Sequence, residues 1–242
     1  MKLAAIIPAA GSGERLGHAL PKALVQVGQH SILYHAVAGA ISHVDQVIVA
    51  APAGSEHIFE HSIKEFVPAV KVVTGGEIRS ASVASALKHI DKEITHVLVH
   101  DAARCFTPTE VFNQVASKVA ETGLGVIPVL PVADTIKEVS RETVLSTISR
   151  DNLRIAQTPQ GFNYSDLFEK YQNATRDFTD DASLVQEAGG KIISVSKSGI
   201  SLKSPSEPKG FGSAACKALR DDILLLAMEK LGHLHPHLLH FR

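Results

Sequence analysis

The chain has 242 residues, which is enough for one α/β domain of ordinary size or for two small ones. Hydrophobic residues make up 45% of it and charged residues 20%, a balance that is normal for a packed soluble domain and too apolar for a disordered chain. The formal net charge is −1, from 24 Lys and Arg against 25 Asp and Glu, so we expect no bulk electrostatic binding of nucleic acid.

Apolar runs of strand length alternate with segments of helical period in the N-terminal half. We expect strands at Leu3–Ile7, Gln46–Ala50, Val70–Val73, His96–His100 and Gly125–Val129, and helices at Ser31–Ser42, Ser80–His89 and Glu110–Val119. This alternation predicts an α/β, Rossmann-like fold with a mostly parallel sheet and helices on both faces. Ligands bind at the carboxyl ends of the strands in such sheets, so the loops that follow strands are the first candidates for function.

The stretch from Asp134 to Arg150 interrupts the alternation. Thr135–Val139 and Val144–Ile148 alternate apolar and polar residues on either side of a polar stretch, which predicts a β-hairpin with one covered face. A two-stranded hairpin is marginally stable alone. We therefore expect this arm, at about 132–150, to pack on something such as a partner chain.

The C-terminal part is expected to contain a helix at Asp180–Ala188, a late strand at Lys191–Val195 and a closing helix at Ala218–Leu231. Ser204–Ala215 is rich in Ser, Pro and Gly and is interpreted as an irregular inserted loop. The tail at about 232–242 contains four histidines, and a frayed end is favoured over a metal site because no other ligand types gather there. There are no internal repeats, and residues 1–242 are interpreted as a single domain.

A glycine-rich loop follows the first strand and runs from Pro8 to Gly17, with Pro21-Lys22 shortly after it. Small residues let backbone N–H groups approach phosphate oxygens, and Arg15 and Lys22 add full positive charge. The spacing of the glycines is not G-x-G-x-x-G, and no Gly-Lys-Ser/Thr follows, so neither a dinucleotide fingerprint nor a Walker A loop is indicated. A structural turn would explain the glycines alone, whereas the two added cations favour a phosphate-binding loop.

Asp101 and Arg104 follow the buried strand that ends at His100. An Asp in this position can hold Mg²⁺ between phosphates, and Arg104 can pair with a second anion. The alternative is an internal Asp–Arg pair that caps the next helix. His100 itself is interpreted as a packed neighbour rather than a ligand.

Three further polar segments complete the candidates. The turn at Gly75-Gly76 leads to a helix start and could add a base or ribose contact to its structural role. Thr158–Phe162 and Thr179–Ser183 are polar clusters after apolar stretches, and the second is expected to be a capping motif.

Cysteine content and hydropathy indicate the cellular compartment in which the protein is expected. Cys105 and Cys216 stand far apart and outside any C-x-x-C, which excludes a disulfide framework and a cysteine zinc site. No apolar run approaches the roughly 18–20 residues of a membrane span. The apolar start flows into the glycine loop and is interpreted as a first strand rather than a signal peptide. We therefore expect a cytoplasmic protein with no membrane contact.

Taken together, the motifs closely resemble those of the 2-C-methyl-D-erythritol 4-phosphate cytidylyltransferase family. They read PAAGSGERLG, PKAL, GG-x-x-R-x-x-SV, VHDAAR, PV-x-DTIK, TPQGF and TDDAS, occur in family order, and cover Met1 to about Ile200. The resemblance implies a nucleotidyltransferase-type α/β fold whose protruding β-hairpin is a homodimerisation arm. It also implies that CTP condenses with a methylerythritol phosphate, that pyrophosphate leaves, and that Mg²⁺ is required, in the non-mevalonate route to isoprenoid precursors.

The resemblance further implies roles for individual residues. Charge stabilisation and substrate positioning fall on Arg15, Lys22, Arg150 and Lys203. CTP contacts fall on Ala9, Ala10, Gly11, Gly76, Glu77 and Ser82. Contacts to the substrate phosphate fall on Arg104, Thr135 and Thr158, and the Mg²⁺ ligand is Asp101. Because Thr135 and Arg150 belong to the arm, they would reach the site of the partner chain.

The sequence departs from the family pattern in two places. Cys105 stands where the family usually has a proline, a change expected to affect only loop stiffness. The C-terminal motif lacks the acid that would help hold the metal, and the stretch from Ser204 to Ala215 has the character of an insertion. Spacing from the TDDAS motif assigns the C-terminal lysine to Lys203, with Lys217 as the rival alignment.

Three alternatives remain open at this point. A related cytidylyltransferase for a pentitol phosphate, such as ribitol 5-phosphate, would share the CTP loop and differ around the acceptor, where TPQGF and PV-x-DTIK favour the methylerythritol substrate. A non-catalytic nucleotide-binding homologue is suggested by the irregular C-terminal motif and opposed by the intact Arg15, Lys22 and Asp101. A Rossmann oxidoreductase is disfavoured by the glycine spacing.

Overall fold

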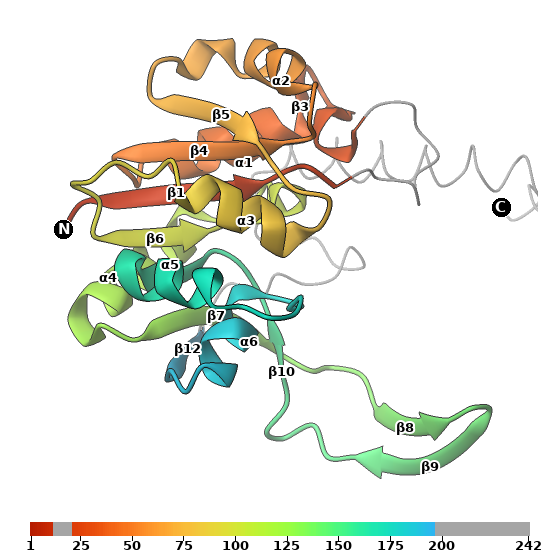
Figure 1. The fold of residues 1–242 in the computed structure, drawn as a ribbon. Helices are drawn as coiled ribbons and strands as arrows, with labels where there is room; N and C mark the ends of the chain where they lie inside the picture. The colour runs from red at the N-terminus through yellow and green to blue at the C-terminus, as the bar shows by residue number, and fades with distance from the viewer. Residues whose placement is uncertain (12–20, 197–242) are drawn as a thin grey trace, which may run out of the picture.

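The computed structural model describes residues 1–11 and 21–196, and one large mixed sheet organises them (Figure 1). Its eight strands are β1 (Leu3–Pro8), β4 (Gln46–Ala51), β5 (Val70–Thr74), β6 (His96–Val99), β7 (Gly125–Pro131), β10 (Arg154–Ala156), β11 (Gln160–Asn163) and β12 (Ile192–Ser196). The order is β10-β7-β11-β6-β1-β4-β5, with β12 paired to β7. The pairs β1–β4, β1–β6, β4–β5 and β7–β12 are parallel, which confirms the predicted mostly parallel sheet.

Helices cover both faces of this sheet, as predicted. The first face carries α1 (Ile32–Ile41), α2 (Glu56–Ser62) and α4 (Thr109–Thr122), and the second carries α3 (Arg79–Leu87), α5 (Tyr164–Gln172) and α6 (Asp181–Glu187). Alternate residues of β1 enter the two cores: Ala5 and Ile7 pack in the first, and Ala4 and Ile6 in the second. Burial on both sides explains why this strand is a continuous apolar run rather than an alternating one.

Local signals set the ends of several helices. The Ser31 hydroxyl accepts a hydrogen bond from the Tyr34 amide at 3.1 Å and begins α1. The Asp180 carboxylate accepts one from the Ser183 amide at 3.0 Å and begins α6, so the expected capping motif is confirmed. At the other end of α4, Gly123 adopts a φ of 66° and its amide donates to the Val119 carbonyl, which closes the last turn.

The predicted hairpin is present as β8 (Ile136–Ser140) and β9 (Thr143–Ile148), and it extends away from the main sheet in Figure 1. Its apolar side chains are exposed: Val139 by 52%, Val144 by 56% and Leu145 by 58%. The expected covered face is therefore not covered by the described residues 1–11 and 21–196. A two-stranded hairpin with an uncovered apolar face is marginally stable by itself.

No strand was predicted in the polar cluster at Thr158–Phe162. Gln160–Asn163 forms β11, which lies antiparallel between β6 and β7 at the centre of the sheet. The Gln160 side chain is buried, and both ends of its amide group are hydrogen-bonded: the nitrogen donates to Asp180 and the oxygen accepts from the Ala182 amide. Tertiary hydrogen bonds thus allow a polar residue within the sheet.

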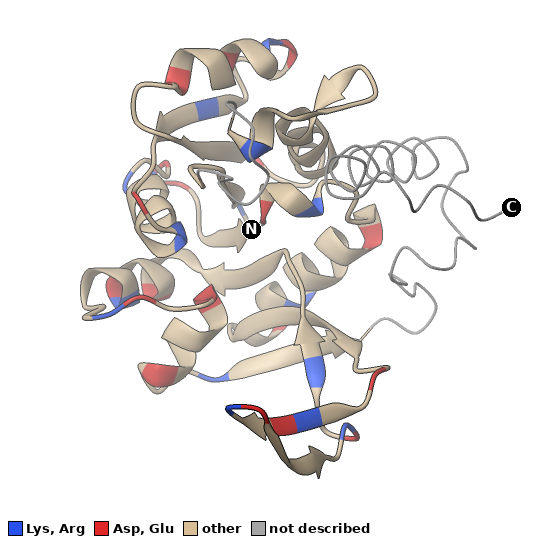
Figure 2. Cartoon of the chain, turned by 90° about the vertical axis from the view of Figure 1, so that its right-hand side faces the viewer, with Lys and Arg blue, Asp and Glu red and all other residues tan. Residues whose placement is uncertain are grey.

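Several short elements were not predicted: α2, α5, β10, β2 (Gln26–Val27), β3 (His30–Ser31), and the 3₁₀ turns η2 (Lys22–Leu24), η3 (Lys64–Phe66) and η4 (Ala102–Arg104). The expected loop at 204–215, the closing helix at Ala218–Leu231 and the tail at about 232–242 lie outside the described residues. Acidic and basic residues are interspersed over the surface elements, including the hairpin (Figure 2). No helix in the described ranges has both the length and the apolar character needed to cross a membrane.

Candidate functional site

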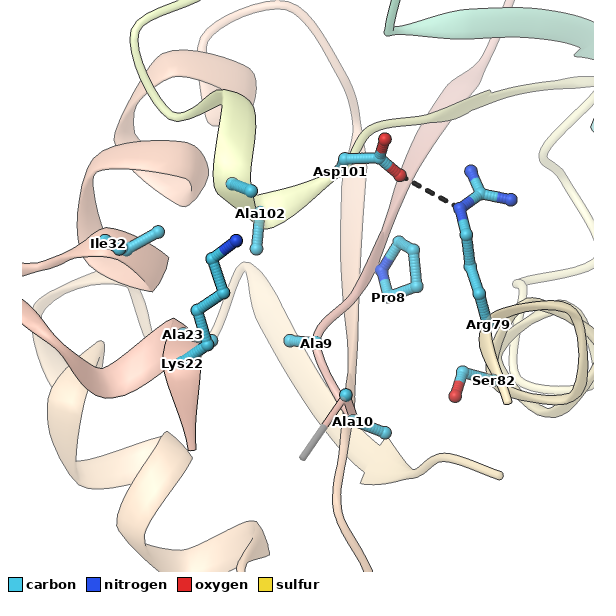
Figure 3. Close-up of a pocket in the computed structure, with 12 residues that line it drawn as sticks. Pro8, Ala9, Ala10, Lys22, Ala23, Ile32, Arg79, Ser82, Asp101 and Ala102 are labelled. Carbon is cyan, nitrogen blue, oxygen red and sulfur yellow. Dashed lines mark hydrogen bonds and ion pairs between the residues drawn. The ribbon is translucent and has the colours of Figure 1, made fainter. Parts of the chain in front are cut away.

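A first cavity opens at the carboxyl end of β1 (Figure 3). It has a volume of about 260 Å³ and is lined by Pro8, Ala9, Ala10, Gly11, Lys22, Ala23, Ile32, Arg79, Ser82, Asp101, Ala102 and Ala103. These residues come from the loop after β1, the starts of η2, α1 and α3, and the turn after β6. The cavity therefore lies at the strand ends, where sheets of this type usually bind ligands.

Close backbone packing shapes the wall of this cavity. A Cβ atom on Gly75 would lie 2.8 Å from the Ala10 Cβ and 2.9 Å from the Ser82 hydroxyl oxygen, so the turn after β5 requires glycine there. The Gly76 amide donates to the Ser82 hydroxyl at 3.1 Å. Gly76 therefore adjoins the cavity through Ser82 rather than lining it, and Glu77 is an exposed neighbour of the same turn.

Lys22 supplies the cation of the first cavity. It begins η2, and its side chain extends towards Ala102 in Figure 3. Among the described residues its ammonium group makes no ion pair, so its charge is available to an anion. Arg15, the second cation expected in this loop, lies outside the described residues.

A second cavity, of about 300 Å³, adjoins the first. It is lined by Arg79, Asp101, Arg104, Ala156, Gln157, Thr158, Gln160, Thr179 and Asp180. Arg79 and Asp101 line both cavities and therefore stand where the two meet. The structure thus brings Asp101 together with the loop after β1 on one side and with Arg104 and Thr158 on the other.

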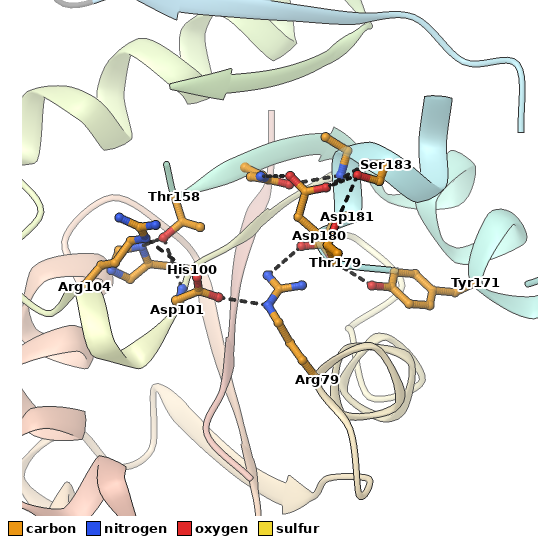
Figure 4. Close-up of polar contacts among 12 residues, drawn as sticks. Arg79, His100, Asp101, Arg104, Thr158, Tyr171, Thr179, Asp180, Asp181 and Ser183 are labelled. Carbon is orange, nitrogen blue, oxygen red and sulfur yellow. Dashed lines mark hydrogen bonds and ion pairs between the residues drawn. The ribbon is translucent and has the colours of Figure 1, made fainter. Parts of the chain in front are cut away.

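The Asp101 carboxylate is held by two guanidinium groups (Figure 4). Arg79 Nε donates to Oδ1 at 3.0 Å, and Arg104 Nε lies 3.7 Å from Oδ2. The internal Asp–Arg pair considered from the sequence is therefore present, but at a cavity surface, with 32% of the Asp101 side chain exposed. Arg104 also donates to the side-chain oxygen of Gln157.

Thr158 is hydrogen-bonded to the segment that follows β6 and contains Asp101. Its hydroxyl oxygen accepts from the Asp101 amide at 3.2 Å and lies 3.1 Å from Nδ1 of His100. Burial lowers the pKa of His100 to about 4, against smaller effects of Asp101 and Arg104, so the ring is neutral at pH 7. The ring also packs edge-on against Phe112, which supports its interpretation as a packed neighbour.

Arg79 is a site residue that sequence reasoning missed. Its Nη2 donates to Oδ2 of Asp181 at 2.7 Å, and Oδ1 of Asp181 accepts from the Tyr171 hydroxyl at 2.6 Å. Burial alone would lower the pKa of Arg79, but the carboxylates of Asp181 and Asp101 raise it above its ordinary value. Burial and the same Asp181 carboxylate also raise the pKa of Tyr171. The signal available in the sequence was the arginine of the motif GG-x-x-R-x-x-SV.

Asp180 and Gln160 were also missed as cavity residues. Burial opposes ionisation of Asp180, but hydrogen bonds from Ser183 and Gln160 lower its pKa below the ordinary value. Both residues lie in segments that the sequence had marked as polar, TDDAS and TPQGF. Only their spatial neighbours show that these segments meet at one cavity.

Thr135 and Arg150 are not brought to either cavity within one chain. Both are exposed and lie at the base of the hairpin, where the Arg150 guanidinium donates to the Ala133 carbonyl. Lys203 and its rival Lys217 lie outside the described residues.

The residues at the junction fit a magnesium ion that is shared with phosphates. In the described part of the chain, no three His, Cys, Asp or Glu side chains gather as a complete ligand set. Mg²⁺ is commonly held by one or two carboxylates, with phosphate oxygens and water as its other ligands. Asp101, partly exposed at the meeting point of the two cavities, matches that donor set.

Comparison with known proteins gives a consistent result. The family model described as 2-C-methyl-D-erythritol 4-phosphate cytidylyltransferase matches residues 3–208. The chain is 45% identical over 201 residues to the protein of that name from Saccharopolyspora erythraea, covering 81% of this chain and 90% of the relative. It is 41% identical over 198 residues to that of Frankia casuarinae, covering 80% and 73%. The crystal structure of the Thermus thermophilus protein of the same name superimposes with a TM-score of 0.69 at 30% identity, covering 92% and 98%.

Proposed function

This chain belongs to the 2-C-methyl-D-erythritol 4-phosphate cytidylyltransferase family, and we propose that its two adjoining cavities hold the two substrates of that reaction. The enzyme is a nucleotidyltransferase that joins CTP and 2-C-methyl-D-erythritol 4-phosphate, in the non-mevalonate synthesis of isoprenoid precursors. An oxygen of the acceptor phosphate attacks the α-phosphorus of CTP. The bond between that phosphorus and the leaving pyrophosphate breaks.

One observation carries the placement of the substrates: Asp101 and Arg79 line both cavities, with a further cation on each side. Lys22 lies in the first cavity and Arg104 in the second. A reaction between two anions depends mainly on positioning and on neutralising charge. Cations on the two sides of the junction would both position the anionic substrates and neutralise their charge.

CTP occupies the first cavity. Ala9, Ala10 and Gly11 have small side chains, so the loop after β1 lets the nucleotide approach the backbone closely. Gly76 and Glu77 contribute from the neighbouring turn, which Ser82 joins to the cavity wall. Lys22, with Arg15 of the same loop, stabilises the charge that develops on the α-phosphate and the leaving pyrophosphate.

Asp101 is the proposed ligand of Mg²⁺, supported by its position at the junction and its partial exposure. The ion, when bound, neutralises phosphate charge and orients the triphosphate. Arg79 and Arg104 hold the carboxylate on either side, so its direction towards the cavities is set by the protein.

The acceptor phosphate occupies the second cavity, beside Arg104. Gln157 holds the Arg104 guanidinium, and Thr158 binds the backbone of Asp101. A lysine near the C-terminus completes this contact in our assignment, and the matched family range of 3–208 includes Lys203 and ends before Lys217.

The enzyme functions as a homodimer in which each arm completes the partner's site. The exposed Val139, Val144 and Leu145 provide the apolar surface that a partner chain would cover. Thr135 and Arg150, which line neither cavity of their own chain, would then contact the acceptor in the other subunit. The reaction takes place in the cytoplasm.

Pyrophosphate release tests the assignment. The purified protein is incubated with CTP, Mg²⁺ and a panel of acceptors that includes 2-C-methyl-D-erythritol 4-phosphate and ribitol 5-phosphate. We expect turnover with the methylerythritol phosphate and little with the pentitol phosphate. A preference for ribitol 5-phosphate would show that the enzyme is a cytidylyltransferase for pentitol phosphates. CTP binding without pyrophosphate release would show that the protein is a non-catalytic homologue.

A further inference from the structure

Arg79 divides its guanidinium between two carboxylates that are far apart in the sequence. Nε bonds Oδ1 of Asp101 at 3.0 Å, and Nη2 bonds Oδ2 of Asp181 at 2.7 Å (Figure 4). An arginine facing a single carboxylate ordinarily uses two of its N–H groups on both oxygens. Because Nη2 is taken by Asp181, Arg79 reaches Asp101 through one bond only.

That single bond leaves Oδ2 of Asp101 without a hydrogen bond from Arg79, and among the described residues only the ion pair with Arg104 adjoins it. Oδ2 has Arg104 Nε at 3.7 Å, which is beyond hydrogen-bond distance. The Asp101 side chain therefore keeps one oxygen fixed by Arg79 and presents the other at the meeting point of the cavities. A single carboxylate oxygen held in a fixed direction suits Mg²⁺, because this ion takes its other ligands from phosphate oxygens and water.

Asp181 and Tyr171 prevent Arg79 from changing this arrangement. The Asp181 side chain is fully buried, and its other oxygen is bonded to the Tyr171 hydroxyl at 2.6 Å. Asp181 opens α6 while Tyr171 belongs to α5, so two packed helices hold the carboxylate. Its negative charge also balances Arg79, which leaves the charge of Asp101 less neutralised.

We propose that Arg79 is a positioning residue for Asp101, and that Asp181 and Tyr171 fix Arg79 in turn, so that one Asp101 oxygen is kept available to Mg²⁺. The proposal rests on the proposed function, in which Asp101 is the metal ligand. Asp181 and Tyr171 line neither cavity, so they act through Arg79 and not on the substrates.

The test measures how strongly Mg²⁺ and CTP binding are coupled. The dissociation constant of CTP is measured by calorimetry without acceptor, once in EDTA and once in saturating Mg²⁺. The ratio of the two constants reports the contribution of the metal. In Asp181→Asn the amide keeps the shape of the carboxylate but not its charge, so its hydrogen bond from Nη2 is weaker and Asp101 competes better for that group. We expect the ratio to fall about tenfold, the lower range for loss of an outer-shell partner, with the constant in EDTA unchanged.

Tyr171→Phe provides a second, conservative variant that keeps the ring and removes only the hydrogen bond to Asp181. We expect it to lower the ratio in the same direction by a smaller factor. Arg176→Gln is the matched control, because it breaks an exposed arginine pair with Glu187 of α6 and does not touch Asp101. Its ratio should equal that of the wild type.

The outcomes separate this proposal from the function on which it rests. An unchanged ratio in both Asp181→Asn and Tyr171→Phe overturns it, as does an equal loss of CTP affinity in EDTA and in Mg²⁺, which is the sign of a purely structural role. If wild-type CTP binding does not respond to Mg²⁺ at all, the metal role of Asp101 is itself wrong and the positioning role falls with it. Pyrophosphate release would still report independently on cytidylyl transfer.

Discussion

At the residue scale, the cationic side chains of the candidate site differ in whether they already have a partner within the protein. Arg79 and Arg104 are both paired with carboxylate or amide oxygens, whereas Lys22 has no ion pair among the described residues. A cation without an internal partner loses no existing interaction when it binds phosphate. Lys22 is therefore the described residue whose charge is most directly available to the transition state.

Lys22→Ala should lower kcat far more than it raises KM for CTP. The charge on the leaving pyrophosphate grows in the transition state, so the ammonium group stabilises that state more than bound CTP. Loss of one such donor typically lowers the rate by roughly 10²–10³. Steady-state kinetics of pyrophosphate release measures the effect, and Arg15→Ala should behave similarly. Lys88→Ala, at an exposed lysine after α3, is the control, and a Lys22→Ala enzyme with the control's kcat would contradict the assignment.

His100 should make the fold sensitive to acid. Burial lowers its pKa to about 4 in the folded chain, whereas an unfolded histidine titrates near 6.5. The unfolded state therefore binds the extra proton first, and stability falls as the pH drops from about 6.5 towards 4. The loss attributable to this one group approaches roughly 3 kcal/mol. Urea unfolding at a series of pH values measures it.

The control for this effect is the exposed His57 on the surface of α2. His100→Gln should flatten the pH dependence between 6.5 and 4, and His57→Gln should leave it as in the wild type. A wild-type stability that does not change over that range would show that the buried ring does not govern the acid response.

At the scale of elements, β11 lies so close to α4 that the contact requires a glycine. A Cβ atom on Gly161 would stand 2.7 Å from methyl carbons of both Val115 and Val119, and 3.1 Å from one of Leu98. Valine is stiff at χ1, so neither side chain of α4 can turn away easily. The absence of a side chain at Gly161 therefore sets the distance between this helix and the sheet that carries Thr158.

Gly161→Ala should lower the free energy of unfolding by about 1–3 kcal/mol, the usual range for an added methyl group in a packed core. Denaturant unfolding monitored by circular dichroism measures the change. Gly39→Ala in α1 is the matched control, because its nearest atom is 4.0 Å away and alanine favours a helix. We expect that variant to be neutral or slightly more stable, and an equal response of the two variants would contradict the packing argument.

At the scale of the whole molecule, each site is proposed to contain parts of two chains. The body of one subunit provides Lys22 and Arg104, and the arm of the other provides Arg150. A twofold dimer of this kind has two equivalent sites, each with one body and one arm. Inactivating a body residue in one chain and an arm residue in the other leaves one site of the mixed dimer whole.

Mixing inactive Lys22→Ala with inactive Arg150→Ala subunits should therefore restore activity. Random exchange makes half of the dimers mixed, each with one of its two sites intact, so about a quarter of the wild-type activity is expected. Turnover is measured after exchange has been verified by mass spectrometry of intact dimers.

The matched control combines Lys22→Ala with Arg104→Ala. Both residues belong to the body, so every site in their mixed dimers lacks one of them and no activity should return. No recovery in the first mixture would show that each site is built within one chain, whereas recovery in the control would show that Lys22 and Arg104 do not serve the same site.

The sequence alone was sufficient to predict those features that depend on local patterns of residues. The apolar run of β1, the capping motif at Asp180 and the alternation of strands and helices follow from hydrophobic periodicity and hydrogen bonds between near neighbours, and all were confirmed. The motif order was enough to indicate the family. The position of Asp101 after the end of β6, beside the loop that follows β1, follows from the same patterns, since the carboxyl ends of neighbouring parallel strands share one sheet edge.

Only the tertiary structure decided which polar segments meet. Arg79 and Asp181 are 102 residues apart, and no local signal pairs a helix start after β5 with the start of α6. Gln160 has the polarity of a loop residue, and it enters a central strand because Asp180 and the Ala182 amide satisfy its side chain. Burial of polar groups depends on partners that the chain brings together only by folding, so local pattern predicted the candidate site residues while long-range contacts determined their orientation.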